Sequence, residues 1–282
     1  MIKYYSINGE ILPKEKAVIG IDDLVVTRGY GVFDFFRLRK GQPVFIEDHL
    51  DRFEYSAEKL GLELPYSREE IAQKVLELAA ANEVSDCGIK VILTGGYSTT
   101  GFSPGKPNIL MMASPIPSYP EHYYTKGIKL MAYQYTRETP YTKTTNYLVP
   151  IQIRKEIEEA EAMDVLYHDG QYISESARSN FFIFNHDDVL ITPDINALRG
   201  ITRKQVLEVA KQHFEVEIRP LSLKETMNAK EAFMTSTTKE ILPVRQVDFW
   251  RINKSIIGNN TRKLMQLFKE HINNYIAARV QV

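Results

Sequence analysis

The chain has 282 residues, of which 44% are hydrophobic and 25% are charged, so it is long enough for two domains with ordinary globular composition. Its formal net charge of −1 provides no basic field, which argues against a nucleic-acid-binding protein. The single cysteine, Cys87, excludes an internal disulfide, and no apolar run is long enough for a membrane span or a signal-peptide core, so we expect a cytoplasmic protein with no membrane segment.

The first part of the chain combines strand patterns with two helices. The strand patterns are those of 3–9, 10–23, 88–96 and 108–116, and of a hairpin over 30–46 that turns at Lys40-Gly41. Apolar spacing from Ile46 predicts a helix that ends at Gly61, and a capping box at Ser67 and Glu70 begins a second one. These elements predict an N-terminal α/β domain over residues 1–114.

Three prolines lie between Pro115 and Pro120, a composition typical of a domain boundary, so we predict a linker over 115–121 and a second domain over 122–282. In the second domain we expect a strand at 125–136, a helix at 148–162, hairpins over 164–174 and 180–193, a helix at 201–214, a strand–loop–strand over 230–249 and a final helix at 260–278. This irregular interleaving favours two α/β or α+β domains over a doubly wound parallel sheet. No dinucleotide or P-loop fingerprint is present.

Lys143 lies in the segment YTKTTNYL. Most lysines are solvated surface residues, but a Schiff-base lysine needs an amine that is unprotonated part of the time. The residues that follow it, Thr144 to Tyr147, are neutral hydrogen-bonding groups that add no carboxylate to hold the lysine charged. The segment is therefore compatible with either role.

Glu175 stands in ISESARSNFF, close to the apolar residues Ile173, Phe181 and Phe182. A buried carboxylate needs a partner, and a pyridinium nitrogen would be a chemically useful one because its protonated ring accepts electrons. The alternative is a strand-end glutamate that pairs with Arg178 or faces solvent.

Three groups of residues are candidates for anion binding. A helix start, a polar loop between apolar strands, and a helix arginine placed opposite the Leu50/Phe53/Ala57 stripe all supply donors. These candidates are Gly200, Ile201 and Thr202; Ser236, Thr237 and Thr238; and Arg52.

Together these motifs resemble those of the class IV pyridoxal-phosphate aminotransferases, which include branched-chain aminotransferases, D-amino acid aminotransferases and aminodeoxychorismate lyases. The resemblance covers nearly the whole chain, through NGEILP, RGYGVFDFFR, HLDRFEYSAEKLGL, KTTNYL, DGQYISESARSNFF, LRGITR and TSTTKEILPV. It implies a small N-terminal α/β domain and a larger C-terminal pseudo-barrel domain, with pyridoxal 5′-phosphate between them, and a homodimer.

The resemblance also implies residue roles. Lys143 would form the Schiff base with the cofactor and move the substrate proton, and Glu175 would face the pyridine nitrogen. The phosphate would be held by Arg52, by Gly200, Ile201 and Thr202, and by Ser236 and Thr237. Tyr147 and Asn180 would lie near the ring. The substrate would contact Phe33, Phe35, Arg37 and Thr238, and no metal is expected.

Several positions bear on the substrate. The spacing from Lys143 to Asn146 is similar to that of the D-amino acid and lyase branches, and Lys90 stands where branched-chain enzymes carry a carboxylate-binding arginine. Phe35 narrows the expected pocket and favours an apolar substrate, whereas Arg37 offers a site for a carboxylate of glutamate or 2-oxoglutarate. We expect transamination between a branched-chain or hydrophobic L-amino acid and 2-oxoglutarate. The alternatives are an aminodeoxychorismate lyase that forms p-aminobenzoate, a D-amino acid aminotransferase, and a member that binds the cofactor without turnover.

Overall fold

The computed structural model describes residues 1–255 and 257–280, which form two compact units. Unit 1 contains Met1–Pro117, and unit 2 contains Ser118–Tyr141 and Tyr147–Asn273. Unit 1 also contains Thr142–Asn146 and the C-terminal residues from Asn274, which the sequence assigned to the second domain. The segment that carries Lys143 is therefore part of unit 1.

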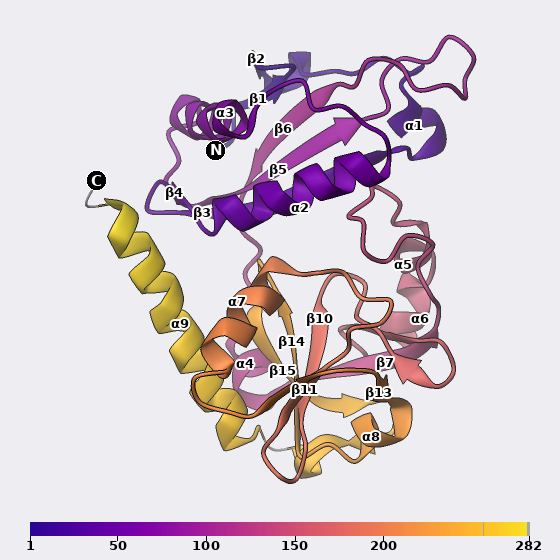
Figure 1. Cartoon of the computed structure of the whole chain (residues 1–282), viewed down its shortest axis with the longest axis vertical. Helices are drawn as coiled ribbons and strands as arrows, with labels where there is room; N and C mark the ends of the chain where they lie inside the picture. The colour runs from indigo at the N-terminus through magenta and orange to yellow at the C-terminus, as the bar shows by residue number, and fades with distance from the viewer. Residues whose placement is uncertain (256, 281–282) are drawn as a thin grey trace. The chain divides into compact units, whose positions relative to one another are not determined.

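Unit 1 is built on a six-stranded sheet in the order β2-β1-β6-β5-β3-β4 (Figure 1). All its pairings are antiparallel, and the strands are β1 (Tyr4–Ile7), β2 (Glu10–Pro13), β3 (Gly31–Arg39), β4 (Gln42–Pro43), β5 (Cys87–Thr94) and β6 (Ile109–Ser114). The predicted hairpin is confirmed. Lys40 and Gly41, which connect β3 and β4, have φ values of 52° and 74°, as a tight hairpin turn requires.

Helices α2 (Ile46–Lys59) and α3 (Arg68–Ala81) lie on this sheet, and the short α1 (Leu24–Arg28) and the 3₁₀ helix η1 (Lys14–Lys16) precede β3. The predicted capping box at the start of α3 is confirmed, because Glu70 N donates to Ser67 Oγ at 3.2 Å and Ser67 N donates to Glu70 Oε2 at 2.8 Å. Two of the four N–H groups at the helix end thus gain protein acceptors.

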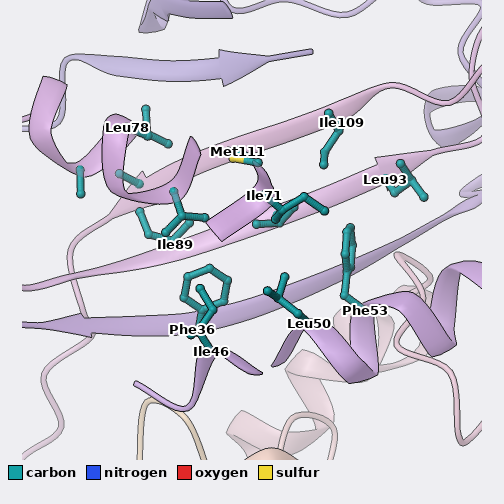
Figure 2. Close-up of a cluster of buried hydrophobic side chains, with 14 of the residues drawn as sticks. Phe36, Ile46, Leu50, Phe53, Ile71, Leu78, Ile89, Leu93, Ile109 and Met111 are labelled. Atoms are coloured by element: carbon teal, nitrogen blue, oxygen red, sulfur yellow. The ribbon is translucent and has the colours of Figure 1, made fainter. Parts of the chain in front are cut away.

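The core of unit 1 lies between the helices and one face of the sheet (Figure 2). Strand β3 alternates, so that Val32, Phe36 and Leu38 face the helices while Phe33 and Phe35 face the other side. Each core side chain contributes about 1.5–3 kcal/mol by leaving water. This packing fixes β3, the strand that carries several of the predicted substrate residues.

Unit 2 is built on a mixed ten-stranded sheet that curls into a half-barrel (Figure 1). Its strand order is β12-β11-β10-β14-β15-β7-β8-β9-β13, and β16 pairs with β15. The strands are β7 (Ile128–Gln134), β8 (Asp164–His168), β9 (Tyr172–Ile173), β10 (Asn180–Phe184), β11 (Leu190–Thr192), β12 (Val216–Ile218), β13 (Leu221–Ser222), β14 (Glu231–Ser236), β15 (Glu240–Val247) and β16 (Trp250–Arg251). The predicted hairpins β8–β9 and β10–β11 and the β14–β15 pair are confirmed.

The helical segments after the linker are α4 (Glu121–Lys126), α5 (Leu148–Gln152), α6 (Arg154–Glu159), α7 (Ile201–Ala210), α8 (Leu223–Met227), η2 (Ile252–Ser255) and α9 (Asn259–Val280). The single helix predicted over 148–162 is wrong, because the chain breaks at Ile153 into α5 and α6. Neither helix has a buried residue of its own, whereas Ile153 is buried with Val165 and Tyr167. The break turns this apolar side chain into the core. In the part of the chain that the structure describes, no helix has the length and apolar composition of a membrane span.

Candidate active site

The backbone of Lys143 is fixed on both sides within unit 1. Phe33 N donates to Lys143 O at 2.9 Å, and Lys143 N donates to Ser56 Oγ of α2 at 3.2 Å. Thr144 pairs with Val32 as an isolated antiparallel bridge, so the segment lies alongside the start of β3. These contacts fix the point from which the lysine side chain extends.

The Lys143 ammonium rests on an aromatic ring. Its Nζ lies 4.4 Å from the centroid of Phe33, and Lys90 Nζ lies 5.6 Å from the same centroid. Lys143 makes no ion pair among residues 1–255 and 257–280. An amine that no carboxylate pairs with is the type that can act as a nucleophile.

Beneath this segment lies a buried cluster of three charged or titratable residues. Arg52 donates from Nε and Nη2 to the two carboxylate oxygens of Asp34, both at 2.8 Å, and His49 Nδ1 lies 2.7 Å from Asp34 Oδ1. Burial alone would raise the pKa of Asp34, but the charges of Arg52 and His49 hold it well below its usual range. Burial in turn lowers the pKa of His49, although Asp34 opposes this shift.

The expected orientation of Arg52 is therefore wrong. It does not lie opposite the apolar stripe of α2 but is buried, with 9% exposure, because it pairs with Asp34 on the inward face of β3. Its role toward a phosphate stays a prediction.

The predicted substrate residues Phe33, Phe35 and Arg37 share the other face of β3 and are half-buried. Phe35 lies across the neighbouring strand β5, where a Cβ at Gly88 would approach its ring to 2.3 Å. Glycine at position 88 therefore sets the place of the Phe35 ring. Arg37 lies on the same face, so the guanidinium adjoins the apolar surface of Phe33 and Phe35.

Glu175 belongs to unit 2 and is 4% exposed. Its carboxylate accepts hydrogen bonds from Arg137 Nη1 at 3.1 Å, from Leu198 N at 3.0 Å and from Asn180 Nδ2 at 3.2 Å. The expected burial of Glu175 thus agrees with the structure, but its ion-pair partner is Arg137 and not Arg178 or solvent. No spacing in the sequence indicated Arg137, which comes from the loop after β7.

The start of α7 offers backbone donors close to this group. Gly200 is the N-cap, and no side chain among the described residues caps the N–H groups of the first turn at Ile201 and Thr202. A Cβ at Gly200 would lie 1.9 Å from Asn180 Oδ1, so only glycine allows this approach. Because Asn180 Nδ2 also donates to Leu198 O at 2.7 Å, one side chain connects Glu175 to the start of α7.

The polar loop between β14 and β15 is the other predicted phosphate site. Helix α7 packs against β14, which ends at Ser236, so both donor groups belong to one part of unit 2. Thr237, Thr238 and Lys239 form the turn, and Tyr119 Oη lies 3.4 Å from Thr238 Oγ1. The N-cap of α5, Tyr147, is also in unit 2 and half-buried, and its predicted position near a cofactor ring stays a prediction.

These features fit pyridoxal phosphate. The uncapped N–H groups of α7 and the loop hydroxyls are suited to a phosphate. Glu175, which is buried and accepts hydrogen bonds, is suited to a pyridine nitrogen, and Lys143 is suited to an aldehyde. The sequence did not indicate Arg137, which contacts Glu175, or Ser56, which accepts a hydrogen bond from Lys143 N.

Comparison with known proteins agrees with this interpretation. Residues 31–247 match the family Amino-transferase class IV. The chain is 31% identical over 273 residues to a putative branched-chain-amino-acid aminotransferase of Methanocaldococcus jannaschii, with 94% of each chain covered. It is 27% identical over 281 residues to a D-alanine aminotransferase of Staphylococcus epidermidis, covering 95% of this chain and 98% of that protein.

A similar fold is found in the crystal structure of the Escherichia coli branched-chain amino acid aminotransferase, with a TM-score of 0.88 and 27% identity over 96% of this chain and 94% of that one. This match confirms the expected fold class. A family match over residues 31–247 and a full-length relative at 31% identity together establish that the chain belongs to the class IV aminotransferases, a family of pyridoxal-phosphate-dependent enzymes.

Proposed function

We propose that this chain transfers an amino group between a branched-chain or other hydrophobic L-amino acid and 2-oxoglutarate, with pyridoxal phosphate carried by Lys143. The observation that carries the proposal is the setting of Lys143, whose backbone is held at both ends and whose Nζ lies over Phe33 without an ion pair in the described chain. Such a lysine is positioned to react with a carbonyl.

When bound, pyridoxal phosphate supplies a carbonyl that accepts amines and a ring that accepts electrons. Lys143 Nζ would hold the cofactor at that carbonyl, and the same Nζ would take the proton from the substrate Cα. Glu175 holds a proton on the ring nitrogen. The first turn of α7 and the hydroxyls of Ser236 and Thr237 bind the phosphate, with Arg52 as a further predicted contact. These contacts keep the ring in place while Lys143 moves.

The proposed substrate class rests on the face of β3. Phe33 and Phe35 provide apolar surface for an aliphatic or aromatic side chain, and the M. jannaschii relative is named as a branched-chain enzyme. One methylene changes binding by only about 1–3 kcal/mol, so related aliphatic amino acids should also react. Arg37 is the proposed contact for the second carboxylate of glutamate.

The test is the near-visible absorption spectrum of the purified protein with pyridoxal phosphate, recorded as L-leucine, L-glutamate and D-alanine are added separately. We expect L-leucine and L-glutamate each to shift the band of the lysine-bound cofactor to that of the amine form. Conversion by D-alanine alone would contradict the proposed substrate class. A band that no amino acid shifts would contradict transamination by these substrates.

The second candidate is a D-amino acid transaminase. It is favoured by the spacing from Lys143 to Asn146 and by the S. epidermidis relative, which is named as a D-alanine aminotransferase. The same titration separates it from the first. The lyase alternative predicts release of pyruvate from aminodeoxychorismate, which a coupled pyruvate assay detects.

We also propose a homodimer, which rests on the family resemblance alone. Sedimentation equilibrium should give twice the mass of one chain, and a single-chain mass at micromolar concentration would contradict it.

A further inference from the structure

Lys239 is a buried lysine that the proposed reaction does not use. It follows the loop Ser236–Thr238 directly and is 1% exposed. Its Nζ donates to Ser179 Oγ at 3.0 Å and lies 3.7 Å from Asp164 Oδ2 at the start of β8. Lysines are almost never this buried unless they are paired, because burying an ammonium group is costly. We therefore ask what this pair contributes to the site.

The groups around Lys239 Nζ come from several elements. Asp164 and Arg178 bring opposite charges, and the ring of Tyr119 lies 5.8 Å from Nζ. Tyr124 of α4 donates to Lys239 O at 3.2 Å. Burial lowers the pKa of Lys239 to about 8, against the pull of Asp164 and with a further contribution from Arg178. The amine therefore changes between its charged and neutral forms near physiological pH.

Ser179, which accepts the hydrogen bond from Lys239 Nζ, belongs to the turn that carries Glu175. Ser176 N donates to Ser179 O at 2.8 Å and closes that turn. The next residue, Asn180, donates to the Glu175 carboxylate at 3.2 Å. At its other end, Lys239 N donates to Ser236 Oγ at 3.3 Å. One residue thus connects the polar loop at Ser236 to the turn at Glu175.

We propose that Lys239 is a positioning residue for the cofactor: it ties the loop Ser236–Thr238 to the turn that carries Glu175, and its ammonium supplies positive charge behind the loop when a phosphate dianion binds there. Above pH 8, binding then draws one proton from solvent onto Lys239 Nζ, because the dianion favours the charged amine. This inference rests on the proposed role of Ser236 and Thr237 in binding the phosphate.

The experiment compares two ligands that differ only in the phosphate. Pyridoxal phosphate and pyridoxal both attach to Lys143, so the ratio of their dissociation constants isolates the phosphate contribution. Cofactor-free wild type, Lys239→Met, Lys239→Arg and Lys230→Met are titrated with each ligand by absorbance at pH 8.5. Lys230 is the matched control, because it lies just before β14 but pairs with Asp188 at the surface.

We expect Lys239→Met to weaken pyridoxal phosphate binding about tenfold while pyridoxal binding changes by less than about twofold. Lys239→Arg should retain most of the affinity, and Lys230→Met all of it. Calorimetry in buffers of different ionisation enthalpy should show that wild type takes up about one more proton per pyridoxal phosphate than Lys239→Met, because the proton changes at Lys143 are common to both proteins.

The double variant Lys239→Met/Asp164→Asn guards against misfolding, because it removes the pair without leaving an unpaired buried carboxylate. It should show the same selective loss. An equal loss of affinity for pyridoxal phosphate and pyridoxal would refute the inference, because it would mean that Lys239 has only a structural role. No loss of affinity in either variant would refute it as well. Wild type that binds neither ligand would refute the proposed function as well, whereas normal binding by wild type and Lys239→Met alike refutes the inference alone.

Discussion

Replacing Asp34 should destabilise unit 1 strongly, because this carboxylate is the acceptor of a buried cluster. It is 1% exposed and receives hydrogen bonds from Arg52 Nε and Nη2 at 2.8 Å and from Phe35 N at 2.7 Å. Asp34→Ala leaves the Arg52 guanidinium buried and unpaired, which costs about 3–5 kcal/mol. Asp34→Asn keeps the shape but loses the charge, and should cost about 1.5–3 kcal/mol.

The effect should depend on pH in one direction. The pKa of Asp34 lies well below its ordinary value of 3.8, because Arg52 and His49 outweigh the opposing effect of burial. A depressed carboxyl pKa gives stability that is complete above the pKa of the unfolded chain and declines as the pH falls through the folded value. The difference in free energy of unfolding between wild type and Asp34→Asn should therefore be constant above about pH 5 and shrink toward pH 2.

Urea denaturation followed by far-ultraviolet circular dichroism is the appropriate assay. The only tryptophan, Trp250, lies on β16 in unit 2, so its fluorescence reports that unit and not unit 1. The matched control is Asp51→Ala, which breaks an exposed pair with Arg68 and should cost less than about 1 kcal/mol. If Asp34→Ala costs no more than Asp51→Ala, the buried cluster does not have the role described here.

Four further predictions concern the proposed reaction and unit 2. Glu175→Gln should still bind pyridoxal phosphate but lower kcat by about 10²-fold or more, since the ring nitrogen loses its anionic partner; an unchanged kcat in stopped-flow measurements would contradict this role. Gly88→Ala should displace the Phe35 ring, which a Cβ would approach to 2.3 Å, and raise KM for L-leucine more than it lowers kcat. Arg37→Ala should raise KM for L-glutamate about tenfold and leave that for L-leucine unchanged, whereas equal kinetics for glutamate would exclude the contact. Finally, the free energy of unfolding of cofactor-free wild type, measured by Trp250 fluorescence, should rise relative to that of Lys239→Met between pH 8 and 10.5. The reason is that Lys239 loses its proton near pH 8 in the folded protein but keeps it to about pH 10.5 in the unfolded chain. A difference between the two proteins that does not change with pH would contradict the lowered pKa of this buried amine.

The elements with strong local signals could be predicted from the sequence. The turn at Lys40-Gly41 and the capping box at Ser67 and Glu70 are set by residues within a few positions of one another, so no tertiary information was needed. The apolar residues around Glu175 likewise predicted a buried carboxylate, and Glu175 is 4% exposed.

The features that were missed depend on contacts distant in sequence. Arg52 was expected to face away from the core, because helical spacing registers apolar residues but not an acid such as Asp34 on a facing strand. Arg137 reaches Glu175 from a loop that carries no periodic signal. Helix 148–162 divides at Ile153 because tertiary burial of that side chain outweighs local helix propensity.

The measurement that tests the central claim most directly is to identify which lysine carries the cofactor. Purified protein loaded with pyridoxal phosphate is reduced with borohydride, which fixes the pyridoxyl group to its lysine, then digested and analysed by tandem mass spectrometry. We expect the group on Lys143, and none on the neighbouring Lys90 or the buried Lys239. A pyridoxyl group found only on another lysine, or on none, would contradict the assignment of Lys143 and the proposed function with it.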